Sequence, residues 1–146
     1  MVIRPARVED VAACVNLAEA VVGSQRAAPL VQAAKNREQL LVAPDGDAVV
    51  GMLAFRTDWF ACTFVTLVSV LPDEQRKGVA RRLFEAVEAR SPGPRLFSST
   101  EETNVAAIRM HRALGFVESG YIDNLPQGYR ELLFYKRLRS ALEIDG

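Results

Sequence analysis

The chain has 146 residues, of which 49% are hydrophobic and 25% are charged, and this suits one globular domain spanning residues 1–146. Its 18 basic and 18 acidic residues balance, whereas general nucleic-acid binding usually needs a basic surface. One histidine, two cysteines without metal-ligand spacing and no apolar run near the roughly 20 residues of a membrane span argue against a zinc site and a membrane protein.

The N-terminal residues predict a short strand followed by two helices. Residues 1–4 form the strand, and residues 8–22 form a helix with Cys14 as a small core residue on its apolar face. A Gly-Ser pair ends this helix, and residues 27–39 predict a second helix that Pro29 interrupts. Charged residues begin early, so a secretory signal is not expected and the cytoplasm is the expected location.

A β-hairpin is expected next. Strands over residues 40–43 and 48–56 flank Pro44-Asp45-Gly46-Asp47, whose Asp-Gly pair supplies the positive φ of a tight turn. Gly51 inside the second strand indicates a bulge or the close approach of another element. The aromatic pair Trp59-Phe60 follows, and it either packs in the core or lines a substrate pocket.

The central stretch predicts a strand, a polar turn and a helix. Residues 64–71 are almost continuously apolar and rich in β-branched side chains, which predicts a strand buried on both faces. Pro72 ends the strand, because proline cannot donate to a sheet ladder. Beyond the turn, apolar residues recur at helical spacing from Ala80 to Val87, so the helix is expected to pack on the sheet.

The turn before this helix has the features of a phosphate-binding loop. A helix start leaves its first N–H groups without partners and carries partial positive charge. Gly78 has no Cβ, so an anion can approach the backbone, and Arg76, Lys77, Arg81 and Arg82 add positive charge. The alternative is an ordinary turn with solvated cations. Neither the Walker pattern nor the three-glycine dinucleotide pattern is present.

The rest of the chain alternates between strands and a helix. The turn Ser91-Pro92-Gly93-Pro94 precedes a strand over residues 95–99, and a helix that starts at Asn104 ends at Gly115. Two closing strands are expected over residues 116–122 and 131–137. The tail from Ser140 is expected to fray.

Two motifs resemble the GNAT N-acetyltransferase superfamily. Residues 75–80, Gln-Arg-Lys-Gly-Val-Ala, match its acyl-CoA pyrophosphate loop, Gln/Arg-x-x-Gly-x-Gly/Ala. Residues 104–116, which begin Asn-Val-Ala-Ala and end Gly-Phe, resemble its second CoA-contacting helix. The resemblance is strong in the C-terminal two-thirds and weak before it. It implies an α/β fold (α+β in some schemes), the GNAT acyl-CoA N-acyltransferase fold, with a mixed central sheet flanked by helices on both faces.

The resemblance implies an N-acetyltransferase that moves an acetyl group from acetyl-CoA, its co-substrate, to a primary amine of a small molecule or peptide. The backbone of Val68 and Val70 would bind the pantetheine arm, and the Val70 N–H would polarise the acetyl carbonyl. Amides of residues 76–81 would hold the pyrophosphate. The implied cofactor-binding residues are Val68, Ser69, Val70, Arg76, Lys77, Gly78, Val79, Ala80, Arg81 and Asn104. Homodimers are common in such enzymes, and neither nucleic acid nor a membrane is an expected partner.

His111 departs from the family pattern, which usually has a tyrosine here as the acid that protonates the CoA thiolate. Tyrosine, with a pKa near ~10, is protonated at neutral pH, whereas histidine, near ~6.5, is mostly neutral. We predict that His111 is catalytic, as this acid or as the base for the amine. The alternative is a core histidine beside Ala107 and Leu114.

The general base stays open, because residues 64–70 contain no acid. The candidates are Glu101, Glu102, Asp58 and Asp123, each with an ordinary structural alternative, and a water chain. The missing acid leaves a second function class in place, a non-catalytic acyl-CoA-binding sensor or interaction module. A longer acyl-CoA is a further enzymatic alternative, and a generic nucleotide-binding domain is disfavoured by the absent fingerprints.

Overall fold

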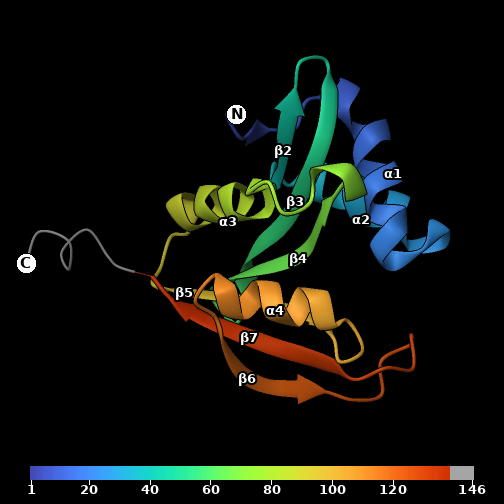
Figure 1. Ribbon diagram of the computed structural model, residues 1–146. Coiled ribbons are helices and arrows are strands. Elements are labelled where there is room, and N and C mark those ends of the chain that lie inside the picture. The colour runs from blue at the N-terminus through green and yellow to red at the C-terminus, as the bar shows by residue number, and fades with distance from the viewer. Residues whose placement is uncertain (139–146) are drawn as a thin grey trace, which may run out of the picture. The chain divides into compact units, whose positions relative to one another are not determined.

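The computed structural model describes residues 1–138, so the expected fraying from Ser140 lies outside the described residues. It contains a mixed seven-stranded sheet in the order β1-β2-β3-β4-β5-β7-β6, together with helices (Figure 1). The strands are β1 (Arg4–Pro5), β2 (Leu40–Asp45), β3 (Ala48–Trp59), β4 (Cys62–Val70), β5 (Arg95–Glu101), β6 (Val117–Ile122) and β7 (Glu131–Arg137). The α-helices are α1 (Val11–Val22), α2 (Ser24–Asn36), α3 (Val79–Arg90) and α4 (Val105–Ala113), and the 3₁₀ turns are η1 (Val8–Asp10) and η2 (Pro72–Glu74). The expected α/β class is confirmed.

The chain divides into two compact units, which are described separately. Unit 1 comprises residues 1–56 and 66–90, and unit 2 comprises residues 57–65 and the chain from residue 91 onward. β3 and β4 each contribute residues to both units. The expectation of one domain over residues 1–146 stays a prediction.

Unit 1 has helices on both faces of its strands. One face carries α1 and α2, whose small side chains, among them Cys14, Ala18 and Ala34, pack with Met52 of β3 and Leu67 of β4. Burial raises the pKa of the Cys14 thiol to about 12, which confirms its expected place in the core. The other face carries α3, which buries Val79, Leu83, Phe84 and Val87.

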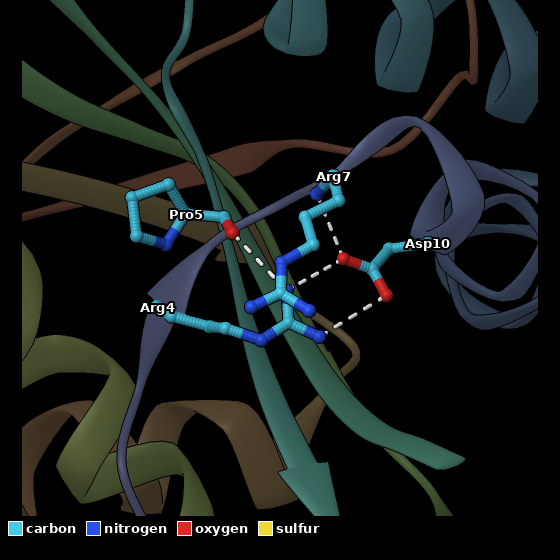
Figure 2. A network of polar contacts seen from close by, with 4 residues as sticks. All are labelled: Arg4, Pro5, Arg7 and Asp10. Carbon is cyan, nitrogen blue, oxygen red and sulfur yellow. Dashed lines mark hydrogen bonds and ion pairs between the residues drawn. The ribbon is translucent and has the colours of Figure 1, made fainter. Parts of the chain in front are cut away.

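The N-terminus of unit 1 is fixed by a charged network (Figure 2). The guanidinium of Arg4 donates to both carboxylate oxygens of Asp10, at 2.6 and 3.3 Å, and the Arg7 N–H donates to Asp10 at 2.7 Å. Because Arg4 belongs to β1 and Asp10 directly precedes α1, the network ties the first strand to the first helix. The hydrogen bond from Arg4 holds the pKa of Asp10 below its ordinary value.

Unit 2 is built from β5, β7, β6 and α4, with the hairpin end of β3 and β4. β5 and β7 pair antiparallel over their full lengths, from Arg95↔Arg137 to Glu101↔Glu131. β4 pairs in parallel with β5 at three positions, from Thr63↔Leu96 to Val65↔Ser98. Trp59 packs on Phe60, Phe64 and Phe97, with ring centroids 4.7 to 5.2 Å apart. Of the two roles expected for Trp59, packing and lining a substrate pocket, these contacts favour packing.

Two expectations about the elements are wrong. Pro29 lies inside α2 without interrupting it, because Ala27, Val31 and Ala34 bury one face of the helix and tertiary packing outweighs the lost hydrogen bond. β4 is not equally buried on both faces: from Cys62 to Val70, half-buried and buried residues alternate. Apolar residues stand on both faces of β4, with Val65 and Leu67 buried and Val68 and Val70 half-buried, so an apolar run did not indicate equal burial of the two faces.

Candidate functional site

In unit 1, the end of β4 presents backbone groups on an edge that no other strand of that unit pairs with, within the described residues. Leu71 N donates to Val50 O at 2.9 Å, which directs the backbone groups of Leu71 toward β3. Because neighbouring residues of a strand direct their N–H and C=O groups to opposite edges, Val70 and Val68 direct theirs away from β3. An extended ligand can therefore hydrogen-bond here like an added strand.

The connection from β4 to α3 turns sharply. Arg76 and Gly78 both have positive φ, 68° and 81°. For a residue with a side chain this conformation costs about 1 kcal/mol or more, so the strain at Arg76 marks a constrained loop. The side-chain amide of Gln75 donates to Val70 O at 3.2 Å and connects the loop to the strand end. Turns of this kind gather backbone N–H groups into an anion-binding concavity.

The loop leads into the N-terminus of α3. Arg82 N donates to Gly78 O at 3.1 Å, so the N–H groups of Gly78, Val79 and Ala80 precede the first intrahelical donor. A Cβ at Gly78 would have no heavy atom within 4 Å, so the space in front of the loop is open. The cations that surround the loop are exposed, and Lys77 lies 3.6 Å from Glu74. This combination suits a phosphorylated ligand.

A cavity of about 220 Å³ lies at the same end of β4 in unit 1. It is lined by residues of α1, β3 and the end of β4, namely Ala13, Asn16, Leu17, Ala20, Val49, Ser69, Val70, Leu71 and Pro72. The Ser69 hydroxyl is already used, because it donates to Leu17 O at 2.8 Å. The cavity therefore offers mainly apolar contact beside the Val70 backbone.

Asn104 of unit 2 is the N-cap of α4. Its side-chain oxygen accepts from Ala107 N at 3.0 Å, which satisfies one of the donors of the first turn. The predicted contact of Asn104 with a cofactor stays a prediction. The capping interaction by itself explains why an asparagine begins this helix.

His111, also in unit 2, is buried, with 1% of its surface exposed. Its Nδ1 lies 2.7 Å from Ala107 O, and its Nε2 lies 2.7 Å from the Ser98 hydroxyl. The ring stacks on Phe134, with centroids 4.5 Å apart and planes 11° apart, and meets Phe116 edge to face. These contacts join α4 to β5 and β7.

The contacts define the protonation of His111. A carbonyl only accepts, so Nδ1 carries the proton and Nε2 accepts from the Ser98 hydroxyl. Burial lowers the pKa of His111 below its ordinary value, although the hydrogen bond to Ala107 opposes the shift. A neutral ring with both nitrogens engaged favours the structural alternative, and the catalytic role of His111 stays a prediction.

Three of the candidate general bases, Glu101, Glu102 and Asp123, lie beside Arg130 or Glu131. Glu101 ends β5 opposite Glu131 of β7, whose carboxylate accepts from the Ser99 hydroxyl at 2.7 Å. Asp123 forms a two-pronged ion pair with Arg130, at 2.9 and 3.3 Å. Asp58 and Glu102 are exposed. The geometry does not select a base among them.

Among the described residues, no group of three or more histidine, cysteine or acidic side chains is placed to hold a metal ion. No helix in residues 1–138 is long and apolar enough to cross a membrane.

Comparison with known proteins gives one family match. The model of the acetyltransferase (GNAT) family matches residues 12–116. No curated protein sequence matched the chain.

Solved structures share the fold over nearly the whole chain. A GNAT-family acetyltransferase from Bacillus cereus is 28% identical, covers 94% of this chain and 97% of its own, and has a TM-score of 0.84. The protein yncA from Salmonella typhimurium, solved with its cofactor acetyl-CoA, is 23% identical, with coverages of 96% and 95% and a TM-score of 0.72. The ribosomal-protein-alanine N-acetyltransferase from Brucella melitensis is 23% identical, with coverages of 94% and 100% and a TM-score of 0.70. The family match spans more than half of the sequence, and this chain belongs to the acetyltransferase (GNAT) family.

Proposed function

We propose that the chain is an acetyl-CoA-dependent N-acetyltransferase that acts on a primary amine of a small molecule or peptide in the cytoplasm. The observation that carries the proposal is the continuity of the ligand groups in unit 1. The outward edge of β4 at Val68 and Val70 leads directly into the Gln75–Gly78 loop and the N-terminus of α3. Acetyl-CoA has the matching chemistry, an amide-bearing arm followed by a pyrophosphate.

The backbone performs most of the binding in this proposal. Among the outward backbone groups of Val68 and Val70, the N–H and C=O of Val68 pair with the amides of the pantetheine arm, as in strand addition, whereas the Val70 C=O already accepts from the Gln75 side chain. The N–H groups of residues 76–81 and the surrounding cations hold the pyrophosphate. The Val70 N–H polarises the thioester carbonyl, whose oxygen gains negative charge when the amine attacks.

The transfer itself forms an amide bond between the amine nitrogen and the acetyl carbon, and it breaks the thioester bond. The amine loses a proton and the CoA sulfur gains one. The proposed acceptors include small molecules and peptides, since relatives in the same fold include proteins named for aminoglycosides and for ribosomal-protein alanine.

The first test is a calorimetric titration of the protein with acetyl-CoA, with CoA, ATP and NAD as controls. We expect acetyl-CoA and CoA to bind at least tenfold more tightly than ATP or NAD. An equal affinity for all four ligands would overturn the cofactor assignment.

Release of free CoA thiol across a panel of amines then tests catalysis. Turnover with at least one amine is expected. Tight acetyl-CoA binding with no turnover on any amine, and no hydrolysis of the thioester, would favour the non-catalytic sensor.

A further inference from the structure

Gly51 of β3 lies directly under the first turn of α3. A Cβ built at Gly51 would lie 2.9 Å from Cγ1 of Val79 and 3.3 Å from Cδ1 of Leu83. Side-chain carbons essentially never approach each other to 2.9 Å, so α3 can occupy this position only because residue 51 has no side chain. Ala43, opposite Gly51 in β2, is 3.5 Å from the same point. The small size of Gly51 and Ala43 therefore allows α3 to pack closely on β2 and β3 at this point.

Val50, the residue before Gly51, contacts the start of the loop that connects β4 to α3. Val50 O accepts the N–H of Leu71, at the point where the chain leaves β4. Val79, which packs over Gly51, is the first residue of α3 and follows the end of this loop. Both ends of the connection over residues 72–78 are therefore anchored on two consecutive residues of β3.

We propose that Gly51 is a positioning residue for the acetyl-CoA pyrophosphate, acting through Val79 on the N-terminus of α3. The proposal rests on the proposed function, because the loop that Gly51 positions is the one proposed to bind the pyrophosphate. Gly51 does not touch the ligand. It sets the distance between the sheet, which carries the Val68 and Val70 backbone groups, and the N–H groups at the start of α3.

Val79 has little freedom to relieve a clash with a new side chain. Its χ1 angle is restricted, because β-branched residues keep one preferred rotamer in a helix. It is 3% exposed, so the surrounding core also restrains it. The first turn of α3 must move instead, and small displacements of binding groups weaken a ligand strongly.

A double-mutant cycle tests this positioning role. The variants are Gly51→Ala, Val79→Ala and the double variant, and the measurements are the acetyl-CoA Kd by calorimetry and the Tm of each protein. Gly51→Ala is expected to raise the Kd about tenfold in the Val79 background. It is expected to change the Kd less than about twofold in the Val79→Ala background, because the atom that the new Cβ would meet at 2.9 Å is removed and only the end of the longer Leu83 side chain remains, at 3.3 Å.

The matched control is Gly93→Ala. A Cβ at Gly93 would have no heavy atom within 4 Å, and Gly93 lies in a turn of unit 2, so its substitution should leave the Kd unchanged. A purely structural role for Gly51 predicts a lower Tm with an unchanged Kd.

Failure of this proposal is distinguishable from failure of the proposed function. If wild type binds acetyl-CoA no better than ATP, the proposed function fails. If wild type binds selectively and Gly51→Ala has no effect, or has the same effect in both backgrounds, only the positioning role is overturned. Should Gly51→Ala not fold, the Kd of the double variant relative to Val79→Ala still decides, since a weakening of tenfold there contradicts the proposal.

Discussion

The His111 Nε2 on α4 and the Ser98 hydroxyl oxygen on β5 lie 2.7 Å apart, and both side chains are 1% exposed. The Ser98 O–H is the donor, because the Nδ1–H of the same ring donates to Ala107 O and leaves Nε2 as an acceptor. One buried hydrogen bond therefore joins the helix to the strand. It uses the ring nitrogen that would otherwise be open to a reacting group.

The first prediction concerns this hydrogen bond. Ser98→Ala leaves the buried Nε2 without a donor and is expected to lower the free energy of unfolding by about 1–3 kcal/mol. Urea unfolding measures the change. Ser119→Ala, at an exposed serine of unit 2, serves as the control, with an expected change within about 0.5 kcal/mol. An effect of Ser98→Ala no larger than the control would contradict the geometry.

The second prediction separates the two roles of His111. His111→Ala removes the stacking on Phe134 and the polar contacts, so a loss of about 2–4 kcal/mol in unfolding free energy is expected. If the role of His111 is only structural, the kcat of the folded variant, measured well below its Tm, should stay within about threefold of wild type. A fall in kcat of about a hundredfold or more, with the acetyl-CoA Kd unchanged, would instead support the catalytic role.

The third prediction is a pH dependence of stability. Burial lowers the pKa of His111 in the folded state, so the unfolded chain binds this proton at a higher pH than the folded chain does. Stability is then full above the unfolded pKa of about 6.5 and falls as the pH drops through and below it. Urea unfolding between pH 7.5 and pH 5.5 should show this decline.

The control for this pH effect is His111→Gln. His111 is the only histidine of the chain, so the variant should lose most of the decline above pH 5.5. An equal slope in the variant and in wild type would assign the effect to other groups.

The fourth prediction concerns the Arg4–Asp10 network of Figure 2. Asp10→Asn removes the charge that Arg4 and the Arg7 N–H contact, and it is expected to cost about 1.5–3 kcal/mol of unfolding free energy at pH 7. The lowered pKa of Asp10 gives stability that is present above the unfolded pKa of about 3.9 and is lost below it, so the difference between the proteins should shrink in acid. Glu9→Gln is the control, since Glu9 is exposed. A difference that is constant with pH would contradict the charged network.

The fifth prediction concerns the phosphate-binding loop. Gly78→Glu places a carboxylate in the open space before α3 and is expected to weaken acetyl-CoA binding at least a hundredfold. Gly78→Ala carries the same backbone strain at a φ of +81° without the charge, and a loss of about tenfold or less is expected. Calorimetry compares the two. Unchanged affinity in the glutamate variant would overturn the assignment of the loop.

Much of the secondary structure followed from local chemistry. The hairpin at Gly46, the end of α1 at Gly23 and the strand–turn–helix order around Gly78 were predicted and are present. Each depends on a residue whose own backbone freedom determines the turn. Pro29 was predicted wrongly, because its effect on α2 is outweighed by the packing of side chains from elsewhere in the chain.

The site was predictable only in part. The Gln75–Ala80 motif predicts an anion-binding loop, and this stays a prediction. Gly51 predicted a bulge or a close approach, and the register of β2 on β3 does shift beside it. The residue that approaches Gly51 is Val79, and it could not be predicted. The residues around position 51 do not indicate which side chain, nearly thirty positions later, packs against it. The same holds for Ser98, which no motif connects with His111.

The sequence by itself determined the order of elements, the family resemblance and the residues of the proposed anion-binding loop, because hydrophobic period, turn residues and short motifs act over a few positions. Only the tertiary structure decided that the His111 ring nitrogens are engaged, that Val68 and Val70 direct their backbone groups away from β3, and that Gly51 admits α3 to the sheet. These features depend on strand register and on side chains that meet across distant parts of each unit, and a residue's own neighbours in the sequence carry no record of them.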